Sequence, residues 1–342
     1  MKKKTIVIAE AGINHNGNLN RALKMVDVAK TAGANFIKFQ TFNPNSLATK
    51  KAKKASYQKK SNDFTKNQLD MLKKYTLNHK DFLKIFNYCK KKKILFLSSA
   101  FDLESLIFLK KIGCRVYKIP SGEINNVPYL KKLGSFNKKI FLSTGMSNLN
   151  EIKYSINVLV KSGTKKSNIT VLHCVSEYPA KFKKLNLNAI KFLKKKLNMN
   201  IGYSDHSLGI EAPISAVSIG ASVIEKHFTL NKNLRGPDHK MSLDGNELKQ
   251  MIQCVRNIEL SLGVNNKIVS KAENSIKKLV RKDLTNFKPT RIKKDLKNFG
   301  VTKIDYIELY NSKSLKRPKN KKEIFRIFIA FYLNKTRLID NI

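Results

Sequence analysis

The sequence predicts an α/β protein, a closed (β/α)8 TIM barrel followed by a small C-terminal module. Strand-like runs rich in β-branched and aromatic residues alternate with amphipathic helical stretches up to about residue 262. Eight such runs occur, which is the number that a closed barrel of this type requires. Beyond residue 262 the alternation is lost, so we expect a separate module there.

The strand-like runs occupy residues 5–13, 36–42, 94–101, 116–123, 139–146, 169–176, 200–207 and 223–230. The helix-like runs include residues 19–33, 103–113, 150–163, 211–221 and 246–263, and several end at Gly, which favours a helix C-cap. An open doubly wound sheet would also alternate. However, the first run continues as AGINHNGN, which lacks the GxGxxG spacing of such folds, so we favour the barrel.

Three segments complete the predicted organisation. The barrel domain covers residues 1–262, a linker covers 263–280, and the C-terminal module covers 281–342. Between the second and third strands, residues 43–78 form an insertion that contains KKAKKASYQKK, and we interpret this insertion as a mobile basic loop.

The composition limits the function classes. The net charge is +44, but the excess is mostly lysine spread over many helix-like segments, which argues against specific nucleic-acid binding and favours attraction of anionic substrates. No long uncharged apolar run predicts a membrane span, and the N-terminus does not resemble a signal peptide, so we expect a cytoplasmic protein. The four cysteines are far apart and are expected to be buried thiols.

Two histidines at the ends of neighbouring predicted strands indicate a metal site. His206 follows the seventh strand and His227 lies in the eighth. Two imidazoles can hold one divalent cation while leaving positions open for water and substrate. The adjacent carboxylates, Asp205 and Glu225, are expected to orient these imidazoles.

Two lysines and several serines predict an anion-binding cradle at the same end of the barrel. Ammonium groups and hydroxyl donors together suit a small molecule that carries a phosphate and a carboxylate. The residues are Lys38, Lys118, Ser99, Ser121, Ser143 and Ser204. A desolvated lysine could instead form a Schiff base, as in an aldolase, which leaves a second enzymatic interpretation open.

Glu10, at the end of the first strand, is the candidate general acid or base, with an ion pair to a neighbouring lysine as the alternative. Asn14, His15 and His173 are interpreted as structural, and His79 as a surface residue.

The motifs together resemble the sialic acid synthase family, which condenses phosphoenolpyruvate with amino sugars to make N-acetylneuraminate and related nonulosonic acids. The motifs, in chain order, are IAEAGINHNGN, FIKFQTF, SSAFD, YKIPSGE, LSTGM, HCVSEYP, YSDHS, EKHFTL and RGPDHKMSL. The GPDH form of the last motif is similar to synthases that use manno-configured acceptors, either N-acetylmannosamine or the diacetamido-trideoxy sugar that leads to legionaminate.

The resemblance implies site roles and partners. It implies a homodimer and a divalent metal held by His206 and His227, such as manganese, with magnesium or cobalt as alternatives. It places phosphoenolpyruvate at Lys38, Lys118, Ser121, Ser143 and Ser204, and the acceptor sugar near Glu10, Gln40, Tyr178 and Asp238. At the position of Ser176 some members carry Asn.

Members of the family usually end in a small antifreeze-like (SAF) domain that contributes an arginine to the partner's sugar site. Here LKRPKNKK matches that arginine with Arg317 but has lysines in place of two glycines, so the turn is expected to differ. Beside a synthase and a Schiff-base aldolase, a third interpretation is an inactive relative that binds polyanions through its basic surface.

Overall fold

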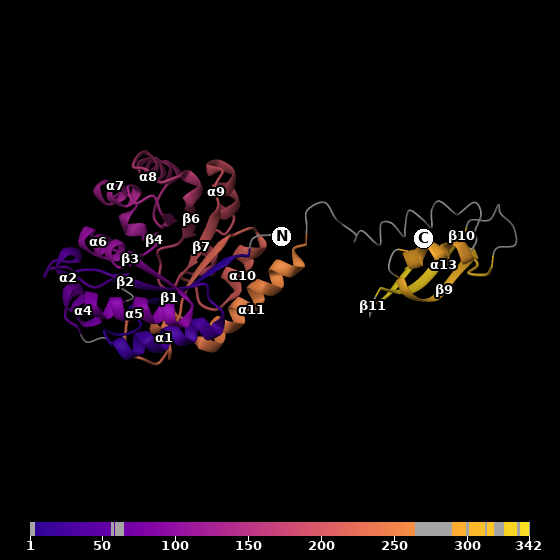
Figure 1. The fold of residues 1–342 in the computed structure, drawn as a ribbon, viewed down its shortest axis with the longest axis horizontal. Helices are drawn as coiled ribbons and strands as arrows, with labels where there is room; N and C mark the ends of the chain where they lie inside the picture. The colour runs from indigo at the N-terminus through magenta and orange to yellow at the C-terminus, as the bar shows by residue number, and fades with distance from the viewer. Residues whose placement is uncertain are drawn as a thin grey trace. The chain divides into compact units, whose positions relative to one another are not determined.

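The computed structural model describes residues 4–55, 58, 65–263, 289–298, 301–311, 313–317, 325–333 and 336–341. The chain forms two compact units, Met1–Leu262 and Gly263–Ile342. Figure 1 shows the barrel in the first unit and a small sheet with one helix in the second. No helix among the described residues is both long and apolar enough to cross a membrane.

Eight parallel strands close into a barrel in chain order, with β1 paired to both β2 and β8. The strands are β1 (Ile6–Gly12), β2 (Phe36–Thr41), β3 (Leu95–Ala100), β4 (Val116–Ile119), β5 (Lys139–Ser143), β6 (Ile169–Cys174), β7 (Ile201–Asp205) and β8 (Val223–His227). The barrel predicted from the sequence is thereby confirmed.

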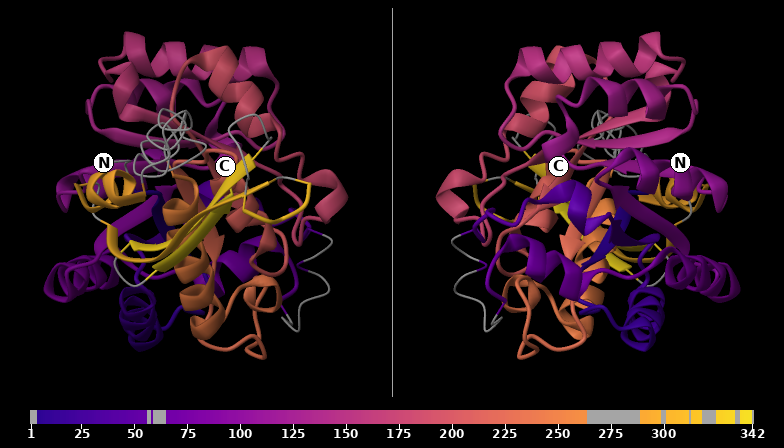
Figure 2. Two further views of the ribbon diagram at one scale, coloured as in Figure 1. Left: turned by 90° about the vertical axis from the view of Figure 1, so that its right-hand side faces the viewer. Right: turned by 90° about the vertical axis from the view of Figure 1, so that its left-hand side faces the viewer.

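Helices surround the strands (Figure 2). They are α1 (Leu19–Ala32), α2 (Pro44–Leu47), α4 (Gln68–Tyr75), α5 (His79–Lys92), α6 (Leu103–Lys111), α7 (Val127–Gly134), α8 (Leu149–Lys161), α9 (Ala189–Leu197), α10 (Glu211–Ser218) and α11 (Gly245–Ser261). The last of these, α11, contacts both α10 and α1, which completes the ring.

Asparagine side chains begin many of these helices. Asn18, Asn67, Asn78, Asn126 and Asn148 each accept a hydrogen bond from a backbone N–H in the first turn that follows. Such caps satisfy donors that the helix itself leaves unpaired, and lysines in several last turns complement the helix dipole. The asparagine and lysine content of the chain therefore supports its helices.

Side-chain alternation along the strands builds both the core and the site. The outward set, which includes Val7 and Ala9 of β1, packs against helix residues such as Ala22 and Met25. An inward cluster fills the barrel, consisting of Ile8, Phe36, Leu97, Phe141, Leu172 and Val223. Because successive side chains on a strand point to opposite faces, the residues two positions further along form the next inward layer. That layer is polar, and it contains Glu10, Lys38, Ser99, Ser143, Cys174 and Glu225.

The insertion between β2 and β3 differs from the prediction of a loop. Its described part contains α2 and α4, and α4 buries Leu69, Met71, Leu72 and Tyr75. The loop prediction was wrong for these helices. In α4 the apolar residues of QLDMLKKY have helical spacing, although a lysine-rich stretch precedes them. Residues 56–57 and 59–64 lie outside the described residues.

The C-terminal unit contains one helix and a three-stranded antiparallel sheet. Its elements are α13 (Pro289–Asn298), β9 (Val301–Asn311), β10 (Phe325–Leu333) and β11 (Thr336–Asn341), with β10 in the centre. Buried Leu296 from α13 and buried Ile307, Ile327 and Ile329 from the sheet indicate a core. The predicted linker, 263–280, lies outside the described residues after Gly263.

Candidate active site

A pocket of about 330 Å3 opens at the carboxyl ends of the barrel strands. Its lining includes Glu10, Lys38, Gln40, Ser99, Lys118, Ser121, Ser143, Ser176, Tyr178, Ser204, His206 and His227. The structure therefore brings together every site residue expected from the barrel except Asp238. Asp238 lines an adjoining cavity with Gln40, Tyr178 and His227.

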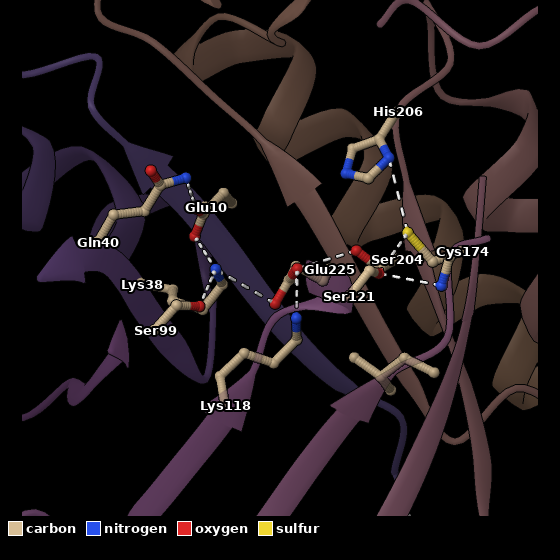
Figure 3. Close-up of polar contacts among 12 residues, drawn as sticks. Glu10, Lys38, Gln40, Ser99, Lys118, Ser121, Cys174, Ser204, His206 and Glu225 are labelled. Atoms are coloured by element: carbon tan, nitrogen blue, oxygen red, sulfur yellow. Dashed lines mark hydrogen bonds and ion pairs between the residues drawn. The ribbon is translucent and has the colours of Figure 1, made fainter. Parts of the chain in front are cut away.

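Four charged side chains form a buried chain of alternating charge at the pocket floor (Figure 3). Lys38 Nζ lies 2.8 Å from Glu10 Oε2 and 3.7 Å from Glu225 Oε2. Lys118 Nζ lies 3.5 Å from Glu225 Oε1. Each of these side chains is no more than 6% exposed, so each charge depends on its neighbours for compensation.

The two carboxyl groups have opposite pKa shifts. Burial raises the pKa of Glu10 to about 7, against the stabilising charge of Lys38 and with added repulsion from Glu225. Burial acts in the same direction on Glu225, but Lys118 and Lys38 on either side outweigh it and lower its pKa to about 2. Glu225 is therefore a permanent anion, whereas Glu10 can change protonation near neutral pH.

The two lysines also differ. Burial disfavours the ammonium of Lys38, but Glu10 and Glu225 outweigh burial and raise the pKa of Lys38. Burial lowers the pKa of Lys118, which has one close carboxylate and feels the positive charge of Lys38. An incoming anion would hold Lys118 in its charged form.

Hydroxyl groups line the wall of the pocket on the side of β4 to β7. Ser204 Oγ donates to Glu225 Oε1 at 2.9 Å, and Gly145 N donates to Ser121 Oγ at 2.9 Å. Ser143 Oγ is buried and has no hydrogen-bond partner among the described residues. A Cβ atom on Gly145 would lie 2.1 Å from Ser176 Oγ and 2.8 Å from Ser121 Oγ, so only glycine leaves room for this arrangement.

The two candidate metal ligands face one another at the pocket mouth. The rings of His206 and His227 have centroids 5.6 Å apart. His206 Nδ1 lies 2.7 Å from the carbonyl oxygen of Val175, which can only accept, so Nδ1 carries the proton and Nε2 is left for a ligand. His227 Nδ1 is buried with no hydrogen-bond partner among the residues described.

The carboxylates beside these histidines do not orient them, so that expectation was wrong. Asp205 instead accepts hydrogen bonds from Tyr203 Oη at 2.9 Å and from Lys226 Nζ at 2.5 Å, on the outer face of the strands. Glu225 lies between the two lysines. Successive side chains point to opposite faces, which separates Asp205 from His206, whereas Glu225 shares the inward face with His227 but pairs with the lysines.

The loop that carries Asp238 is attached to the loop after β1. Asn14 Nδ2 donates to the carbonyl oxygen of Phe228 at 2.9 Å and Asn16 Nδ2 to that of Arg235 at 2.7 Å. His239 Nε2 lies 3.0 Å from Asn16 Oδ1. Burial raises the pKa of Asp238 to about 6, partly offset by the charge of His206.

Comparison with known proteins matches most of the first unit to one family. Residues 25–267 match the model of the NeuB family. The chain is 50% identical over 282 residues to an N,N'-diacetyllegionaminic acid synthase of Campylobacter jejuni, which covers 82% of this chain and 84% of that protein. The chain belongs to the NeuB family. This is the sialic acid synthase family that the strand-end motifs indicated.

Other relatives support the NeuB assignment. An N,N'-diacetyllegionaminic acid synthase of Legionella pneumophila is 42% identical, covering 82% of this chain and 79% of its own length. The crystal structure of an N-acetylneuraminic acid synthetase from Leptospira borgpetersenii in complex with citrate superposes with a TM-score of 0.74 at 35% identity. That match covers 83% of this chain and 94% of the other.

The C-terminal part of this NeuB chain matches a different family. Residues 247–342 are similar to pantoate-beta-alanine ligase. A small extra module is therefore present, and its antifreeze-like character stays a prediction that this match does not support. Arg317, expected in that module, is exposed between β9 and β10, and the residues directly after it lie outside the part that the structure describes.

Some residues of the NeuB site were missed or misplaced by sequence reasoning. Glu225 was expected to orient a histidine, and Gly145 was not singled out; Cys174 is the buried thiol that was expected, but its place in the pocket lining was missed. A period of two counted from Leu172 or Val223 would have placed Cys174 and Glu225 in the inward layer. The structural roles expected for Asn14, His15 and His173 agree with their contacts.

Breaking the Asp205–Lys226 pair should destabilise the barrel. Lys226→Met leaves Asp205 buried without its counter-charge, which we expect to lower the free energy of unfolding by about 3–5 kcal/mol. Urea unfolding followed by far-UV circular dichroism measures this loss. The double variant Asp205→Asn/Lys226→Met should recover much of it, whereas Lys232→Met, at a partly exposed pair with Glu247, should cost no more than about 1 kcal/mol. Equal losses for Lys226→Met and Lys232→Met would contradict the argument.

Proposed function

We propose that this protein is a nonulosonic acid synthase that condenses phosphoenolpyruvate with an N-acetylated sugar of manno configuration. The observation that carries the proposal is the buried chain of Glu10, Lys38, Glu225 and Lys118 beneath two facing histidines. The relatives named as N,N'-diacetyllegionaminic acid synthases favour the diacetamido-trideoxy acceptor over N-acetylmannosamine.

Phosphoenolpyruvate fits the floor of the pocket. Lys38 and Lys118 supply positive charge, and Ser143 supplies a buried hydroxyl with no partner among the described residues. The phosphate and the carboxylate of the substrate would favour the charged form of Lys118, against the burial that lowers its pKa. Ser121 and Ser204 lie in the same wall and complete the proposed cradle, with Ser99 at 3.1 Å from Lys38 Nζ.

The acceptor would bind above, at the mouth. Gln40, Tyr178 and Asp238 surround His227 there. His206 and His227 would hold a divalent ion, since each leaves a ring nitrogen without a protein donor or acceptor in the described part of the chain. When bound, an ion such as manganese, with magnesium or cobalt as alternatives, polarises the aldehyde oxygen of the open-chain sugar.

In the proposed reaction, C3 of phosphoenolpyruvate forms a bond to the aldehyde carbon, and the aldehyde oxygen takes up a proton from Glu10. Water adds to C2, one of its protons returns to Glu10, and the other leaves with the phosphate when the bond between C2 and the phosphate oxygen breaks. The products are a 2-keto sugar acid and inorganic phosphate. Glu10 suits the proton transfer because its pKa of about 7 lets it donate at neutral pH.

The Schiff-base interpretation keeps one supporting observation, because burial lowers the pKa of Lys118 and a neutral amine is a nucleophile. Against it, Glu225 lies 3.5 Å from this amine and favours its charged form. Borohydride trapping of pyruvate on Lys118 separates the two reactions.

The proposal includes a homodimer in the cytoplasm, with Arg317 reaching the partner's acceptor site. Arg317 is exposed on the C-terminal unit and could make such a contact. Light scattering of the purified chain distinguishes a dimer from a monomer. An Arg317→Ala variant with unchanged KM for the sugar would remove this residue from the proposal.

The central test is phosphate release from phosphoenolpyruvate in the presence of manganese. The arms are the diacetamido-trideoxy sugar, N-acetylmannosamine and no sugar, each repeated with His206→Ala. We expect release that requires both a sugar and His206, and faster release with the diacetamido acceptor. No release from a folded protein that binds many polyanions in a salt-sensitive way would favour the inactive binding protein instead.

Glu10→Gln should depress turnover by about 100-fold, since the amide cannot donate the proton, while phosphoenolpyruvate still binds. In the unmodified enzyme the protonated fraction of Glu10 falls as pH rises through about 7, so kcat should fall above that pH. This decrease of kcat at higher pH should be missing from the pH profile of Glu10→Gln. Near-normal turnover of the variant would exclude Glu10 from the role.

Gly145→Ala should weaken phosphoenolpyruvate binding about 10-fold, because displacing one hydroxyl donor costs about 1.4 kcal/mol. The new methyl group would collide with Ser176 Oγ and Ser121 Oγ. Isothermal titration calorimetry measures the change. Gly122→Ala is the matched control, since a Cβ atom there meets nothing within 4 Å. Equal affinities for the two variants would refute the steric argument.

A further inference from the structure

A second cavity, of about 170 Å3, adjoins the reaction pocket on its acceptor side. Gln40, Tyr178 and His227 line both spaces. Neither Lys38 nor Lys118 is among the described residues that line the second cavity. Whatever occupies it therefore extends from the molecule held at the histidines and not from the anion held at the lysines.

Among the described residues, half of those that line this cavity are apolar, and helix α4 of the insertion supplies two of them. Met71 and Leu72 of α4 belong to a small cluster with Ile13 and Phe42. Phe42 packs edge-on against Phe101 with ring centroids 6.3 Å apart. Because these side chains are fixed by one another, the cavity is a formed feature that an apolar group of a ligand can fill.

The other half of the described lining is polar, so the cavity suits a group that carries both a methyl and an amide. Gln68, the first residue of α4, has a buried side-chain oxygen without a hydrogen-bond partner among the described residues. Asp238, which is buried, also lines the cavity. A buried amide oxygen without a donor is unfavourable, so Gln68 marks the place where a ligand N–H is needed.

We propose that this cavity is a specificity subsite for the second acetamido group of the acceptor, the one further from the reacting aldehyde. The acetamido methyl group lies against Phe42 and Met71, and its N–H donates to Gln68 Oε1. An acceptor with a hydroxyl group in that position leaves the apolar walls unfilled. The inference rests on the proposed synthase function and names the acceptor class of that same site.

The test compares kcat/KM for the diacetamido-trideoxy sugar and for N-acetylmannosamine in four proteins: the unmodified chain, Gln68→Leu, Gln68→Asn and Gln253→Leu. We expect the ratio of the two values to fall about 10-fold in Gln68→Leu, mostly through KM of the diacetamido sugar, because the hydrogen bond to its N–H is lost. Gln68→Asn keeps an amide but shortens its reach, so it should show the same selective loss. If Gln68→Leu does not fold, the ratio measured for Gln68→Asn decides whether Gln68 recognises the diacetamido sugar.

Gln253→Leu is the matched control, since Gln253 is an exposed glutamine on α11. Its ratio should equal that of the unmodified protein. An equal decrease of kcat/KM for both sugars in the Gln68 variants, or no decrease, would overturn the proposed subsite. Neither result would contradict the proposed synthase function. If the unmodified protein releases phosphate with neither sugar, the proposed function fails and the subsite fails with it.

Discussion

The compensation of charge inside the barrel mouth is the constraint on which the site depends. Four ionisable side chains are removed from water there, and burial alone would neutralise each of them. Glu225 stays ionised because it lies between Lys38 and Lys118, whereas Glu10, at the end of the series, is paired with one of these two lysines, Lys38. The unequal positions of two otherwise similar carboxyl groups produce a fixed anion and a titratable group within one pocket.

The alternation of side chains along each strand allows one strand to serve both the site and the core. On β8 the inward side chains of Glu225 and His227 belong to the site, while Lys226 between them points outward and pairs with Asp205 from β7. The same alternation repeats on β1 and β2, where the residue before each site residue belongs to the outer core. Three successive residues of a single strand can therefore serve catalysis and stability without competing for space.

The barrel and most of the site could be predicted from the sequence because both follow from short-range periodicity. Strand ends converge in a barrel, so polar termini identify the mouth without any knowledge of distances. The partners of Glu225 and Asp205 could not be predicted, since they depend on which face of the strand each side chain occupies and on the stagger between strands. Prediction of helix α4 required tertiary context, because lysine-rich composition hides weak apolar spacing. The similarity of the C-terminal module to pantoate-beta-alanine ligase required comparison with known proteins.

The contact of α11 with α1 has an evolutionary consequence. The ring of helices closes at α11, immediately before the boundary between Leu262 and Gly263, so the barrel buries its outer face with residues that precede this boundary. A chain built in this way can exchange its tail by recombination at that boundary without redesign of the enzyme that precedes it. The two family matches change over in the same stretch of the chain, where they overlap at residues 247–267.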